Sequence, residues 1–110
     1  MIVKISFLDR YALNELLPAQ NTTYERLLTR EDILEKVKFT ADEVRPFLRE
    51  DQSFNDDALL EQFEIEFSNA EVAAIKDILR RKNDMSKLDI KEKNIYDIFI
   101  LGKNDNTNRN

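Results

Sequence analysis

Hydrophobic and polar residues alternate most regularly in a short segment near the middle of the chain, and the pattern then changes to that of a helix. Apolar side chains occupy every second position of this segment, at Phe63, Ile65 and Phe67. This is the period of a β-strand with one buried face. Ser68 follows at the position of a helix N-cap, and Glu71 stands three residues later, so the two side chains can form a capping box. The sequence therefore predicts a strand that leads directly into a helix ending near Lys82.

The start of the chain repeats this arrangement. The β-branched run Ile2–Ile5 predicts a strand. Ser6 and Asp9 predict a second capping box, which opens a helix that Pro18 ends. Because short strands are marginal on their own, we expect the two strands to pair with each other or with a brief strand around Phe54, under helices that cover their apolar face.

A longer amphipathic helix is predicted between these two units. Thr22 or Thr23 is its expected cap, and it runs to about Lys38. Thr29 could instead cap a second, shorter helix, but the residues around it are good helix formers, so we favour a single helix. The apolar positions of this helix are Tyr24, Leu27, Leu28, Ile33, Leu34 and Val37.

A third cap of the same kind follows that helix. Phe39, Thr40 and Glu43 repeat the spacing of phenylalanine, hydroxyl and glutamate found in the central unit, which predicts a new helix. Pro46 lies within its second turn, where it removes a backbone donor, so this helix is either very short or kinked. A polar loop and a connecting segment then lead into the central strand.

The chain closes with one more helix. It begins after Ser86 or after Asp89, either of which can cap it, and it runs to Leu101. Gly102 follows at the position where a left-handed backbone is favoured. The polar residues 103–110 predict a disordered tail.

Together these elements predict an α+β fold that is mainly helical, with about five helices packed on a small two- or three-stranded antiparallel sheet. The chain of 110 residues is long enough for one hydrophobic core. We expect residues 1–102 to form a single globular domain.

The composition removes several classes of chemistry. The chain contains no cysteine and no histidine, which excludes Ser-His-Asp and Cys-His catalysis and zinc sites built from those residues. No apolar run is long enough for a membrane span and no signal peptide is visible, so we expect a cytoplasmic protein without membrane contact. The formal net charge of −5 weakly opposes binding to nucleic acid.

The acidic loop in the middle of the chain matches a calcium-binding loop only in part. Oxygen-bearing side chains stand at the first four ligand positions of an EF-hand, at Asp51, Ser53, Asn55 and Asp57. Asp56 replaces the required glycine and Gln62 replaces the bidentate glutamate, so a solvated turn is the favoured interpretation. We therefore expect no metal ion, no cofactor and no catalytic site.

The densest basic run is Arg80, Arg81 and Lys82, and its position favours a role in complementing the dipole of a helix C-terminus. The alternative is contact with nucleic acid. The helices before it and a hairpin over residues 53–67 could form a winged-helix domain, with the helix from Ala41 as its recognition helix. That helix is rich in acidic residues and is interrupted by a proline, so we do not expect nucleic acid as the partner.

The last helix is apolar on nearly every side. Its candidate interaction residues are Ile95, Tyr96, Ile98, Phe99, Ile100 and Leu101. A helix that is apolar all round is either threaded into the core or partly covered by another chain. We favour burial with some contribution to a contact between identical subunits.

The order of caps and core positions resembles a loose group of short, uncharacterised phage and prophage-type proteins. These proteins open with a short strand and a serine-capped helix that ends in Leu-Leu-Pro or a similar run. The residues that carry this here are Ser6, Asp9, Arg10, Leu13, Leu16, Leu17 and Pro18. The resemblance extends to about Phe99 and implies a similar fold and an origin in a mobile element, but no activity.

These observations favour a non-catalytic accessory or regulatory protein that binds a macromolecule through protein–protein contacts. A DNA-binding regulator of winged-helix type is one alternative. An acidic inhibitor that imitates nucleic acid is the other, although a net charge of −5 is modest for that role.

Overall fold

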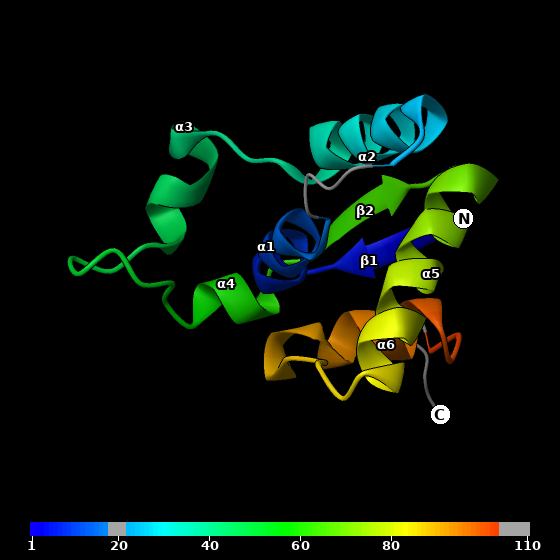
Figure 1. Cartoon of the computed structure of the whole chain (residues 1–110). Coiled ribbons are helices and arrows are strands. Elements are labelled where there is room, and N and C mark those ends of the chain that lie inside the picture. Colours follow the sequence, from blue (N-terminus) through cyan, green and yellow to red (C-terminus); the bar gives the residue numbers. More distant parts are fainter. Residues whose placement is uncertain (18–21, 104–110) are drawn as a thin grey trace.

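The fold is α+β and mainly helical, as the sequence predicts. A computed structural model describes residues 1–17 and 22–103 (Figure 1). Its elements, in chain order, are β1 (Ile2–Ile5), α1 (Phe7–Leu16), α2 (Tyr24–Val37), α3 (Ala41–Val44), the 3-10 turn η1 (Arg45–Phe47), α4 (Asp57–Leu60), β2 (Phe63–Glu66), α5 (Asn69–Asp84), the 3-10 turn η2 (Ile90–Glu92) and α6 (Lys93–Phe99). The expected connector around Pro18 and the expected tail beyond Lys103 lie outside the described residues.

The two strands pair with each other, antiparallel, in a two-stranded sheet. The register places Val3 opposite Ile65 and Ile5 opposite Phe63, so these four apolar side chains share one face, whereas Ile2 lies opposite Glu66 on the other face. The N-terminal amine adds to this pairing, because Met1 donates to the carbonyl oxygen of Phe67 at 2.9 Å. The first residues are thereby joined to the central unit of the chain.

Both serine capping boxes form. The Asp9 N–H donates to Ser6 Oγ at 3.2 Å, and the Ser6 N–H donates to Asp9 Oδ2 at 3.1 Å. At the start of α5 the Glu71 N–H donates to Ser68 Oγ at 3.2 Å, and the Ser68 N–H donates to Glu71 Oε1 at 2.7 Å. Each box fixes the point where a strand turns into the helix that covers it.

The four longer helices enclose the apolar face of the sheet. Helix α1 contacts both α2 and α6, and α5 also contacts both, so each longer helix has two neighbours. Figure 1 shows α2 and α6 at opposite ends of this arrangement. The buried residues between them are Val3, Ile5, Ala12, Leu13, Leu16, Leu17, Ile33, Val37, Phe67, Ile75, Leu79, Ile95, Ile98 and Phe99.

A second apolar cluster attaches residues 39–56, which we call the arm, to the body of the protein. The buried ring of Phe7 is its centre. Four rings surround Phe7 with centroids at 4.6 to 6.1 Å, and they belong to Phe39, Phe47, Phe54 and Phe63. Figure 1 shows the rest of the arm, from α3 to the loop before α4, projecting away from the sheet.

The structure of the arm decides two alternatives that the sequence left open. The helix after Thr40 is a single turn that continues as a 3-10 turn through Pro46, which settles the choice between short and kinked in favour of short. The brief strand at Phe54 pairs with Leu48 in one isolated bridge, and β2 pairs with β1 instead. The hairpin over residues 53–67, which the winged-helix alternative required, is therefore not formed.

In the last part of the chain, the structure shows which residue caps the helical segment and where helix α6 ends. Asp89 rather than Ser86 is the cap, in a third capping box in which the Asp89 N–H donates to Glu92 Oε1 at 2.8 Å. Helix α6 ends at Phe99, two residues before the predicted end. Gly102 has a φ of +71°, the left-handed conformation that its position predicts.

Helix α4 was not predicted. Ala58 is fully buried, and its N–H donates to the carbonyl oxygen of Asn55 at 3.1 Å. This contact anchors one helical turn. The sequence predicts only a connecting segment here, because a helix of four residues is too short to show a helical period.

Candidate interaction surface

The buried carboxylates are the first groups to consider for chemistry. In the part of the chain that the structure describes there are three of them, and all belong to capping boxes. Asp9, Glu71 and Glu92 are each at most 5% exposed. Each also accepts a hydrogen bond from a distant element: from Asn94 Nδ2 at 2.8 Å, from Lys36 Nζ at 2.6 Å and from Lys82 Nζ at 2.6 Å, respectively. Their oxygens are thus used to join helices to one another.

The pKa of Glu71 shows the consequence of this arrangement. Burial on its own raises the pKa of this carboxyl, but the ammonium of Lys36 and the backbone N–H of Ser68 outweigh that effect. The net result is a pKa below the ordinary value, and Glu71 stays ionised at neutral pH. A carboxylate with a lowered pKa and occupied oxygens is poorly suited to general acid–base catalysis.

The buried side chain of Arg10 contacts several segments of the chain. Its Nε donates to the carbonyl oxygen of Val37 at 3.2 Å, and its Nη1 donates to Glu43 Oε2 at 2.9 Å. The guanidinium also lies 4.8 Å from the ring centroid of Phe63 and 5.3 Å from that of Phe39. Arg10 therefore holds the end of α2 and the arm against α1.

Glu43 departs from the cap predicted for it. Its N–H donates to Thr40 Oγ1 at 3.1 Å, so half of the expected arrangement forms. Its carboxylate turns to Arg10 instead of the cap backbone, and this hydrogen bond lowers the pKa of Glu43. The partner lies 33 residues away in sequence, which is why the local pattern could not show it.

The basic run on α5 does not form a single patch. Arg81 pairs with Asp77 at 2.6 Å, and Lys82 pairs with the buried Glu92 at 2.6 Å. Arg80 is exposed to solvent. Since consecutive residues of a helix point in different directions, the three cations serve separate local roles.

The apolar residues of the last helix lie mostly in the core. Ile95, Ile98 and Phe99 are at most 2% exposed, and Tyr96 and Ile100 pack against the core from its edge. Leu101 is the exception, with 54% of its surface exposed. The all-round apolar pattern is therefore explained by burial within this chain.

Two carboxylates of the acidic loop, Asp51 and Asp56, have partners nearby in the chain, whereas Asn55 Oδ1 is buried without a hydrogen-bond partner. Asp51 Oδ1 accepts from both the N–H of Ser53 at 3.0 Å and its hydroxyl at 2.6 Å, and these bonds lower the pKa of Asp51. Asp56 pairs with Arg49 at 3.2 Å. Within residues 1–17 and 22–103, no group of three or more carboxylates is placed to hold a metal ion.

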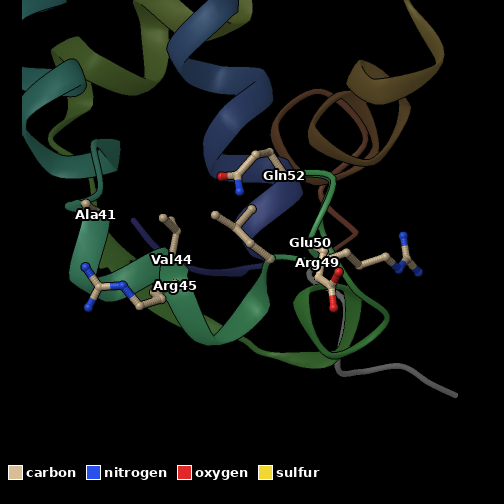
Figure 2. A pocket seen from close by; sticks show the side chains of 7 residues that line it. Ala41, Val44, Arg45, Arg49, Glu50 and Gln52 are labelled. Carbon is tan, nitrogen blue, oxygen red and sulfur yellow. The ribbon is translucent and has the colours of Figure 1, made fainter.

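A shallow hollow of about 380 Å³ lies on the arm. Its lining residues are Ala41, Val44, Arg45, Leu48, Arg49, Glu50 and Gln52. Figure 2 shows the side chains of Arg45 and Arg49 pointing away from each other on opposite sides of it. Arg45 is paired with Asp42 at 2.9 Å, so no set of charged groups converges on a common point inside the hollow.

The apolar residues of helix α2 fall on two faces of the helix. Ile33 and Val37 are fully buried. Tyr24 is 73% exposed, Leu27 37% and Leu28 41%. These three side chains, which we call the α2 stripe, stand at positions i, i+3 and i+4 and therefore share one exposed face.

The signal for this face was present in the spacing. Tyr24 and Leu28 each stand seven residues before a glutamate, Glu31 and Glu35 respectively. Residues seven apart lie on the same side of a helix, so the stripe continues into acidic residues and away from Ile33. The number of apolar residues in α2 does not indicate this exposed face, but the position of each residue around the helix axis does.

None of the helices in the described part of the chain is long and apolar enough to cross a membrane. The chain matches no protein-family model, no curated protein and no solved structure. The resemblance to phage and prophage-type proteins stays a prediction.

Proposed function

We propose that this protein is a non-catalytic accessory or regulatory protein that acts by binding another protein, and that the α2 stripe is its contact surface. The carrying observation is that three large apolar side chains stand exposed together on one helix face. Contiguous exposed apolar side chains are typical of interaction sites. Tyrosine and leucine at helical spacing also supply the anchors that helix-mediated contacts use.

We also propose that the protein has no catalytic activity. Asp9, Glu71 and Glu92 are occupied in capping boxes and in contacts between elements. The charged residues that line the hollow on the arm are Arg45, Arg49 and Glu50, and Arg45 is paired with Asp42. The resemblance to phage and prophage-type proteins suggests a host or phage protein as the partner.

Nucleic acid is not favoured as the partner. Helix α3, the recognition helix of the winged-helix alternative, has only four residues, fewer than a groove-reading helix needs. Two of the three cations of the basic run are paired with acids of the chain. The net charge of −5 opposes approach to phosphates.

Affinity capture from nuclease-treated host lysate tests the proposal. The full-length protein should retain a protein partner, and the double variant Leu27→Ser/Leu28→Ser should lose it. The matched control is Ile90→Ser, because Ile90 is 89% exposed on η2, at the end of the molecule opposite α2. Equal capture by the double variant, or recovery of nucleic acid alone from untreated lysate, would contradict the proposal.

A further inference from the structure

The outward face of α2 changes character along its length. Its first half presents the α2 stripe, and its second half presents carboxylates on the same side. Glu31 lies seven residues after Tyr24, and Glu35 lies seven residues after Leu28. Asp32 is exposed beside them. A partner that covers this face therefore meets an apolar surface followed by an acidic one.

The negative charge of these carboxylates is largely not neutralised by cations of the chain. The ion pairs of residues 1–17 and 22–103 include neither Glu31 nor Asp32, and Glu35 pairs only with Lys38, at 2.6 Å on the surface. The arginines of α2 lie on its other side, because Arg26 stands seven residues before Ile33 and Arg30 seven before Val37.

Two cations of α2, Arg30 and Lys36, donate to groups of other segments of the chain. Arg30 Nε donates to the carbonyl oxygen of Leu17 at 2.8 Å. Lys36 Nζ donates to Glu71 Oε1 at 2.6 Å and to the carbonyl oxygen of Glu66 at 2.8 Å. The outward face of the helix is therefore negative as well as partly apolar.

We infer that the partner segment is a cationic amphipathic helix of another protein, an inference that rests on the function proposed above. Its apolar side would cover the α2 stripe, and its lysines or arginines would face Glu31 and Asp32. A helix is the fitting shape, because the stripe is a ridge of side chains at i, i+3 and i+4, and such ridges pack into the grooves of a second helix. Charge complementarity then determines that the partner helix is positively charged, and it also determines the orientation of that helix.

A second copy of this chain fits the face less well. Its own α2 would bring the same exposed carboxylates to the contact. The one cation that the outward face offers in return is Lys38, which already pairs with Glu35. Like charges brought together at an interface oppose association.

Two synthetic peptides test the inference. Both are amphipathic helices with the same leucine positions, but one has a lysine polar face and the other a glutamate polar face. Titrated into the isotope-labelled full chain, the lysine peptide should bind about tenfold more tightly or better and shift the amide resonances of α2. The difference should shrink at high salt, because exposed charges are screened there.

A charge-reversed variant supplies the control. Glu31→Lys/Asp32→Lys should lose the preference for the lysine peptide. Glu64→Lys/Glu66→Lys makes the same change in net charge on the exposed face of the sheet and should keep that preference. Binding of both peptides equally, binding of neither, or shifts centred away from α2 would overturn the inference. So would α2 shifts on concentrating the protein alone, since they would show that a second copy covers the face.

Failure of this inference is distinct from failure of the proposed function. If Leu27→Ser/Leu28→Ser loses the captured protein but the peptides are not discriminated, only the chemistry assigned to the partner is wrong. If that double variant retains the captured protein, the α2 stripe itself is not the contact surface.

Discussion

At the scale of single residues, Arg10 illustrates how one side chain organises distant segments. It lies in α1, yet it donates to the end of α2 and to Glu43 in α3 while it packs among phenylalanine rings. Such a residue contributes through satisfied hydrogen bonds and through packing of its stem and its guanidinium plane. We therefore regard it as a structural centre and not as a binding group.

Replacing Arg10 by alanine should destabilise the protein by about 2–3 kcal/mol, because carbonyl oxygens of the α2 terminus lose their donor. Equilibrium unfolding in urea measures this. The matched control is Arg45→Ala, since Arg45 pairs with Asp42 on the surface, and it should cost less than about 1 kcal/mol. Equal losses for the two variants would contradict the role assigned to Arg10.

Two carboxylates predict how stability depends on pH. The pKa values of Glu43 and Glu71 are lowered in the folded state, so both groups favour folding when ionised. Their contribution is present above the unfolded-state pKa of about 4.3 and is lost as pH falls through the folded-state values. The free energy of unfolding should therefore fall on acidification, and less steeply in Glu71→Gln. An identical slope in that variant would count against the Lys36–Glu71 contact.

At the scale of secondary-structure elements, local signals explain most of what the sequence predicts correctly. Ser6, Ser68 and Asp89 cap helices through partners only three residues away, so their patterns are complete in the sequence. Glu43 has the same local pattern, but a stronger partner from another helix takes its carboxylate. Prediction fails where a tertiary contact competes with a local one.

Helix α6 should be indispensable for folding. A chain that ends at Asn94 lacks Ile95, Ile98 and Phe99, which are buried against the other helices, and it should show no cooperative thermal transition. A chain that ends at Lys103 keeps these contacts and should melt like the parent. A folded, monomeric product from the shorter chain would show that α6 belongs to an interface instead.

Helices α2 and α5 allow the core and the surface to be compared directly. Ile75→Ala in α5 should cost about 2–5 kcal/mol, because Ile75 is fully buried. Leu28→Ala in α2 should change the free energy of unfolding by no more than about 0.5 kcal/mol, since the side chain is exposed. Urea unfolding checks both, and a large loss at Leu28 would mean that the α2 stripe supports the fold.

At the scale of the whole molecule, the residues that hold α2 in the core are different from the residues that α2 exposes. The sheet, the buried carboxylates and the core helices hold α2 by its Ile33 and Val37 side, which leaves the α2 stripe outward. The spacing in the sequence shows that the apolar residues of α2 fall on two faces, but not which of these faces the other helices cover. That outcome depends on which other helices contact α2, and these are far away in the chain.

The central claim is that the α2 stripe binds another protein, and the affinity of the captured partner tests it most directly. The partner is titrated with the parent chain, with Leu27→Ser/Leu28→Ser and with Ile90→Ser. The last variant changes an apolar side chain that is more exposed than those of the stripe. We predict a loss of at least about 2 kcal/mol in binding free energy for the stripe variant and none for Ile90→Ser. Unchanged affinity of the stripe variant, with its fold intact by circular dichroism, would contradict the account.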